Sequence, residues 1–227
     1  GAAIGEMLFR GIYLANLNEV PLLDEESHQK IYASFSLLSM LTPPGPLYPS
    51  LGDNGGPLAD PILQLGIKML SHPMCTELER ARMLQKDADP EILPRDFCST
   101  KAGFLCSRSS YRHDGNYILM SAKTGCGCSG HNHMDLLSLF LTFRGQSFIG
   151  EPYTDKLYHS IRMSSDLRGY MYNMTSHNTV LAHGEPVLPD CVYANKWGVY
   201  RPDTPVTEYW TDPKGIYVKA HHDAYTY

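Results

Sequence analysis

The spacing of apolar residues changes along the chain, and this change constrains the fold more than any other feature. In residues 1–93 the apolar positions recur at helical intervals. Ile4, Leu8 and Ile12 illustrate the spacing, which places them on one face of a helix. From about Asp96 onward, short runs of β-favouring residues alternate with Gly, Asp and Asn. The sequence therefore predicts an α+β chain, with helices first and an antiparallel β-sandwich after them.

Residues 1–93 are predicted to hold several helices joined by loops rich in Gly and Pro. Asp24 is a good N-cap for the second helix, and the Pro-rich run at 42–46 stops it. Helices with loops of this kind are expected to form part of a helical array rather than a closed bundle. The expected helices cover Ile4–Leu17, a segment after Asp24, Pro61–Leu70 and Thr76–Lys86.

Residues 96–227 are predicted to form the β-sandwich, so the domain boundary falls near residue 94. Arg144-Gly145-Gln146 is a plausible tight turn of a hairpin. Many short strands with turns between them are typical of sandwiches. The expected strands are Gly103–Ser107, Tyr117–Ala122, Leu136–Phe143, Ser147–Gly150, Thr179–Ala182, Val206–Trp210 and Ile216–Ala220.

Composition excludes several classes of protein. With 43% hydrophobic residues among 227, the chain can bury a core. A net charge of -5 without a run of Lys or Arg argues against nucleic-acid binding. No apolar stretch reaches the roughly 18 residues that a membrane-spanning helix needs. The 6 Cys are scattered and lack the paired spacing of a four-Cys zinc site, so their redox state stays open.

The segment Gly130–Asp135 is the richest in chemistry. If it is extended, His131 and His133 point to the same face, and Asp135 continues that parity. Two imidazoles on one face are a natural start for a metal site. With 10 His in the chain, two hydrogen-bonded histidines without a metal are the alternative.

Further segments carry motifs that can be taken together with Gly130–Asp135. The run Phe143–Pro152 reads as strand, Gly turn and strand with an acidic end, and Thr175–Val180 contains Ser-His-Asn-Thr-Val. Between them lies Tyr158–Arg162, and Pro46–Asp53 supplies a Gly-Asp loop in the helical part. In combination with Gly130–Asp135, these motifs resemble the heparinase II/III-like family of polysaccharide lyases. The resemblance covers most of the chain.

The resemblance implies an architecture and a metal site. Residues 1–93 would be the C-terminal helices of an α/α toroid, and the active site would lie between toroid and sandwich. The second His of the pair, His133, would bind a structural zinc together with Glu151 and His177. Because the family more often carries Asp at the acidic position, Asp155 is the nearby alternative. Two imidazoles and one carboxylate suit zinc.

The resemblance also implies a reaction. The expected activity is β-elimination on a uronic-acid polysaccharide, such as the glycosaminoglycans heparin and heparan sulfate, or alginate. His131 would be catalytic as acid or base. Tyr158 and Arg162 would contact the substrate, although Arg162 could equally form an intramolecular ion pair.

The resemblance has consequences for the protein as a whole. The family's catalytic Tyr is expected upstream of residue 1, so these 227 residues alone are expected to show little turnover. A periplasmic or secreted bacterial location is the corresponding expectation. The sequence does not indicate an oligomeric state.

Three other interpretations remain. A cupin-like metal enzyme would use His131, His133, Asp135 or Glu151, and a later His inside a jelly roll, but it leaves residues 1–93 unexplained. A non-catalytic carbohydrate-binding sandwich protein would keep the fold without the chemistry. The letters His-Asn-His suggest a nuclease, but no basic surface accompanies them.

Overall fold

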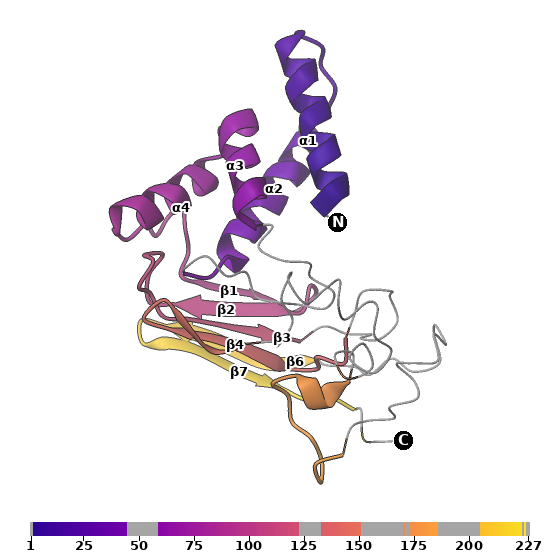
Figure 1. Cartoon of the computed structure of the whole chain (residues 1–227), viewed down its shortest axis with the longest axis vertical. Coiled ribbons are helices and arrows are strands. Elements are labelled where there is room, and N and C mark those ends of the chain that lie inside the picture. The colour runs from indigo at the N-terminus through magenta and orange to yellow at the C-terminus, as the bar shows by residue number, and fades with distance from the viewer. Residues whose placement is uncertain are drawn as a thin grey trace.

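A computed structural model describes residues 2–44, 59–122, 133–150, 170, 173–185, 205–223 and 225. Within these residues, four helices precede the strands, as the sequence predicts (Figure 1). The helices are α1 (Ala2–Leu17), α2 (Glu25–Leu41), α3 (Ala59–Leu70) and α4 (Pro73–Leu84). No helix in this part of the chain is long and apolar enough to cross a membrane.

Local signals explain where α2 and α4 begin and end. The Asp24 carboxylate accepts a hydrogen bond from Ser27 N at 2.8 Å, which confirms the predicted N-cap of α2. Helix α4 starts at Pro73, three residues before its predicted start, because proline suits the first helical position. It ends at Gln85, which adopts a left-handed φ of 52°.

The helices share one apolar core. Phe9 of α1 and Phe35 of α2 pack with ring centroids 4.7 Å apart. At Gly66 of α3, an added Cβ would lie 2.7 Å from the Phe35 ring, so the two helices approach closely at this residue. The other buried members are Ile12, Leu63, Leu70, Cys75, Leu78, Ala81, Leu93 and Tyr111. Because Tyr111 follows the second strand, this core joins the helices to the start of the β region.

Helix α1 is also apolar on the side that faces away from this core. Met7, Leu14 and Leu17 are 67%, 58% and 62% exposed. They recur at intervals of seven and three residues, so they form one stripe along the helix. A helix that is apolar on both sides is typical of one covered on both sides.

The main sheet has five antiparallel strands in the order β1-β2-β3-β4-β5. Neighbours in sequence are neighbours in space, so the sheet is a meander. Strand β1 was not predicted, since its four residues lack a clear alternation. The strands are β1 (Asp96–Ser99), β2 (Phe104–Arg108), β3 (Tyr117–Ser121), β4 (Ser138–Phe143) and β5 (Gln146–Ile149).

A second sheet pairs β6 (Val206–Asp212) with β7 (Gly215–Ala220). The predicted strand at Thr179–Ala182 is wrong: only an isolated bridge between Ala182 and Glu185 forms there. Val180 is 73% exposed, so its β propensity is not supported by packing. The described residues thus establish an α+β fold with two antiparallel sheets.

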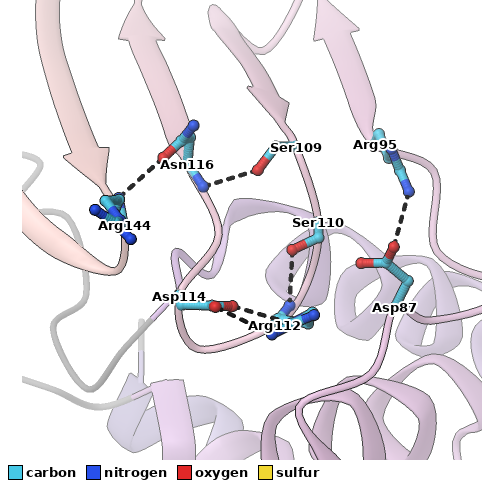
Figure 2. A network of polar contacts seen from close by, with 8 residues as sticks. All are labelled: Asp87, Arg95, Ser109, Ser110, Arg112, Asp114, Asn116 and Arg144. Carbon is cyan, nitrogen blue, oxygen red and sulfur yellow. Dashed lines mark hydrogen bonds and ion pairs between the residues drawn. The ribbon is translucent and has the colours of Figure 1, made fainter.

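The predicted turn between β4 and β5 is present at Arg144-Gly145. Both residues have left-handed φ values, 50° and 74°, as a tight hairpin turn requires. The loop between β2 and β3 supports this turn (Figure 2). Arg144 N donates to Asn116 Oδ1 at 2.9 Å, and Gly145 N donates to Gly115 O at 3.1 Å.

The carboxyl end of α2 docks on the sheet through its backbone carbonyls. Arg108 of β2 is 5% exposed and donates to Thr42 O at 2.9 Å and to Met40 O. The hydroxyl of Tyr117 in β3 donates to Leu41 O at 2.9 Å. The last carbonyls of a helix lack partners within it, so these side chains satisfy them.

Apolar packing surrounds these polar contacts at the junction. Leu41 packs against Cys106, Leu119 and Phe140 of the sheet. Burial raises the pKa of the Cys106 thiol despite the nearby Arg108 guanidinium. Burial also raises the pKa of Tyr111 to about 12. The helical layer and the sheet therefore meet at a well-packed junction around Arg108.

Candidate functional site

Three segments that are distant in sequence meet where β4 begins and β5 ends. Asn178 connects two of them, because its side-chain amide donates to Gly150 O at 2.8 Å and its own carbonyl accepts from Leu139 N at 3.3 Å. The Thr179 hydroxyl donates to Leu136 O. Segment 173–179 is therefore held against both strand ends.

A short 3-10 helix, η1 (Met174–Ser176), positions His177. Asn173 caps it, since its side-chain oxygen accepts from Thr175 N at 3.1 Å. His177 N donates to Met174 O at 3.0 Å and ends the turn. In Figure 1 this orange helix lies below the sheet.

His133 and His177 are in direct contact. Their ring centroids lie 5.2 Å apart at an interplanar angle of 42°. His133 is 1% exposed and His177 is partly buried. The family resemblance implies these two residues as ligands of one metal, and the fold brings them together from distant parts of the sequence.

The two imidazoles suit a shared metal ion. With Zn–N bonds of about 2 Å and tetrahedral angles, two bound imidazoles have centroids about 5 Å apart. That separation agrees with the 5.2 Å between His133 and His177. The described residues contain no group of three possible ligands, so Asp135, buried at 1%, does not complete such a set with them.

The third predicted ligand, Glu151, lies outside the described residues. Its neighbour Gly150 is described, and the hydrogen bond from Asn178 places that carbonyl beside the residue that follows His177. His131, Tyr158, Arg162 and Asp155 also lie outside the described residues. Of the predicted site, the structure brings together His133 and His177.

Sequence reasoning missed the roles of Asn178 and Thr179. The run Ser-His-Asn-Thr-Val contributed to the family resemblance, but only its histidine was given a role. No local signal could have found these roles, because the backbone partners lie 28 and 43 residues away in the sequence. Here these two side chains fix the segment that carries His177.

Solved structures share this fold. A heparinase III structure with methylated lysines matches 98% of this chain and 32% of its own, with a TM-score of 0.71 and 14% identity. Another heparinase III structure matches with a TM-score of 0.65 and 13% identity, over 98% of this chain and 36% of its own. Heparan sulfate lyase HepC from Pedobacter heparinus matches with a TM-score of 0.67 and 12% identity, over 99% and 33%.

These matches define the class of fold. The chain has a heparinase-like fold and spans about one third of the length of the solved structures it matches. No family profile and no curated protein match the sequence. At 12–14% identity, the likeness concerns the fold alone.

Proposed function

We propose that this chain is part of a polysaccharide lyase that cleaves a uronic-acid polysaccharide by β-elimination. The observation that carries the proposal is the contact between His133 and His177 in a heparinase-like fold. Among solved structures with this fold, one is named as a lyase of heparan sulfate. A sulfated glycosaminoglycan such as heparan sulfate, or alginate, is therefore the substrate class.

In this proposal His133, His177 and Glu151 hold a structural zinc ion. Zinc bound by two imidazoles and a carboxylate would crosslink the start of β4, the end of β5 and the segment after η1. The residues fit the metal, because the two described imidazoles are neighbours and Gly150, next to Glu151, is hydrogen-bonded to the same segment. Zinc supplies rigidity here and takes no part in elimination.

His131 is the proposed catalytic acid or base. The proton at C5 of a uronate is α to a carboxylate, so its removal needs a base and a group that neutralises the developing enolate. The leaving glycosidic oxygen needs a proton in return. Arg162 suits a carboxylate or sulfate as a bidentate donor, and Tyr158 is the proposed second substrate contact.

The architecture proposed for the complete enzyme is a toroid joined to a sandwich. The exposed apolar stripe of α1, formed by Met7, Leu14 and Leu17, supports further helices against that side. The domains are then 1–93 in the toroid and 96–227 in the sandwich. Because this chain spans a third of the matched structures, the proposal assigns the missing catalytic groups to the other two thirds. An extracytoplasmic location, periplasmic or secreted, fits a polymeric substrate.

The decisive test is an elimination assay. The gene product that carries this sequence is incubated with heparan sulfate, alginate and hyaluronan, and the ultraviolet absorbance of unsaturated uronates is followed. We expect turnover of at least one polymer, its loss by at least about a hundredfold in His131→Ala, and little turnover by the 227-residue chain alone. Absence of unsaturated products, or full activity of His131→Ala, contradicts the proposal.

Metal analysis separates this proposal from a cupin-like enzyme. We expect about one zinc per chain, bound through His133 and His177. Iron or manganese at the same residues, with redox activity, favours the cupin-like alternative. That alternative does not account for the four helices that precede the sheet, of which α2 packs on it through Leu41.

A further inference from the structure

The hairpin β6–β7 has a well-defined turn. The Asp212 carboxylate accepts hydrogen bonds from Lys214 N at 2.7 Å and from Gly215 N at 3.1 Å. Such an Asx turn fixes the two strands at this end. Pairing keeps one register from Asp212 opposite Gly215 to Glu208 opposite Lys219, and the register shifts between Glu208 and Val206. The hairpin therefore holds side chains in a fixed register.

Two aromatic residues stand opposite each other in this register. Trp210 pairs with Tyr217, and their rings stack with centroids 5.4 Å apart and an interplanar angle of 13°. The two side chains are 49% and 41% exposed. Each ring covers one face of the other, and the exposed part of each side chain remains available to a ligand.

The face that carries this pair also carries charge. Glu208 and Lys219 pair one step along the same face and are exposed. The opposite face of β7 carries Ile216 and Val218, which are partly buried. On β7 the face with Tyr217 is therefore the more exposed one, whereas on β6 both faces are exposed, with Tyr209 at 48%.

We propose that Trp210 and Tyr217 form a stacking platform for a pyranose ring of a polysaccharide. The C–H face of a pyranose packs on an aromatic ring through dispersion and its weakly positive hydrogens. Glu208 can accept hydrogen bonds from sugar hydroxyls, and Lys219 can donate to hydroxyl, carboxylate or sulfate oxygens. An acceptor and a donor beside a flat apolar surface complement a ring that is apolar on its faces and polar on its rim.

Cross-strand stacking also stabilises a hairpin, and it does so here. Stability alone does not require a hydrogen-bond donor and an acceptor beside the two exposed rings. This inference rests on the proposed function for one point only, which is that the ligand is a polysaccharide. The platform needs neither zinc nor elimination, so it can hold a chain without cleaving it.

The test is calorimetric titration of the 227-residue chain with two probes, a heparan sulfate octasaccharide and uncharged cellohexaose. We expect Trp210→Thr and Tyr217→Thr to weaken binding by about fivefold or more, and Tyr217→Phe to retain it. The matched control is Tyr209→Thr, because Tyr209 lies on the same strand, is 48% exposed and points to the opposite face. Threonine keeps the β propensity of the strand.

Each outcome has a defined meaning. Binding of the octasaccharide alone, weakened by Lys219→Ala, assigns the platform to anionic chains, and binding of both probes assigns it to pyranose rings in general. Absence of saturable binding overturns the platform, as does equal weakening by Tyr209→Thr. Self-association that Trp210→Thr abolishes, without sugar binding, also overturns it and assigns the face to a second copy. Amide protection across β6–β7 verifies that the variants fold, and the elimination assay tests the lyase proposal separately.

Discussion

At the scale of single residues, Gly145 leaves the least room for a side chain among the glycines that the structure describes. It has φ 74°, and a Cβ there would collide with the His113 carbonyl of the neighbouring loop. We expect Gly145→Ala to lower the free energy of unfolding by at least about 3 kcal/mol, from backbone strain and a clash with rigid backbone together. Urea denaturation of the two proteins measures the difference.

Gly184 is the matched control for this substitution. Its φ of 76° is nearly the same, but nothing lies within 4 Å of an added Cβ. Gly184→Ala should therefore show the left-handed strain alone, about 1 kcal/mol. If both variants lose the same stability, the collision with His113 does not matter.

His72 is a buried residue whose charge state the fold restricts. It is 2% exposed, and its Nε2 lies 3.0 Å from Tyr32 O, to which it donates as the neutral tautomer. Nδ1 is buried and has no hydrogen-bond partner among the described residues. Burial holds the pKa of His72 below its usual value of 6.5. Protonation would place a second N–H in the apolar core.

This arrangement predicts a pH dependence of stability. As the pH falls below 6.5, the unfolded chain takes up a proton that folded His72 resists, so stability decreases. Titration of His72 can change the free energy of unfolding by at most about 1.4 kcal/mol per pH unit. Denaturation of wild type and His72→Gln at pH values between about 5 and about 7.5 measures this slope. The exposed His113→Gln is the control; equal slopes in wild type and His72→Gln contradict the prediction.

At the scale of elements, the junction of α2 with the sheet depends on Arg108 and Tyr117. Tyr117→Phe removes the donor to Leu41 O and should cost about 1–2 kcal/mol of stability. Arg108→Met leaves two helix-terminal carbonyls without their donor, and we expect a loss of about 3 kcal/mol. Thermal and chemical unfolding measure both values.

Arg112→Met is the control for the charge change. Arg112 is bonded to Asp114 at 3.0 Å in a partly exposed pair, which Figure 2 shows. Exposed pairs contribute about 0–1 kcal/mol. A loss in Arg112→Met as large as in Arg108→Met would show that burial at the α2 end is unimportant.

At the scale of the whole molecule, the proposed metal ion should join segments that are distant in sequence and so raise the free energy of unfolding. If zinc binds only the folded chain, an excess of about a thousandfold over Kd adds about 4 kcal/mol. We expect chelation to lower Tm, and His133→Ala and His177→Ala to abolish the difference between metal-bound and metal-free protein. His183→Ala, exposed at the turn between Ala182 and Glu185, should keep it. An unchanged Tm after chelation contradicts the prediction.

Much of the secondary structure was predictable because its signals are local. The Asp24 cap, the helical spacing in the first 93 residues and the Arg144-Gly145 turn each depend on a few neighbouring residues. Strand β1 and the missing strand at Thr179–Ala182 were mispredicted for the opposite reason. Short strands take their stability from the partner strand, which the local sequence does not contain.

The sequence by itself determined the order of helices and strands, through the period of its apolar residues. The pairing of His133 with His177 came from the family resemblance, and the fold brings the two rings into contact. Tertiary structure alone decided that Asn178 would join two strand ends, that Arg108 would bind the end of α2, and that Trp210 would stack on Tyr217. Such contacts join residues from different elements or strands, and strand register and helix docking fix them only in the folded chain.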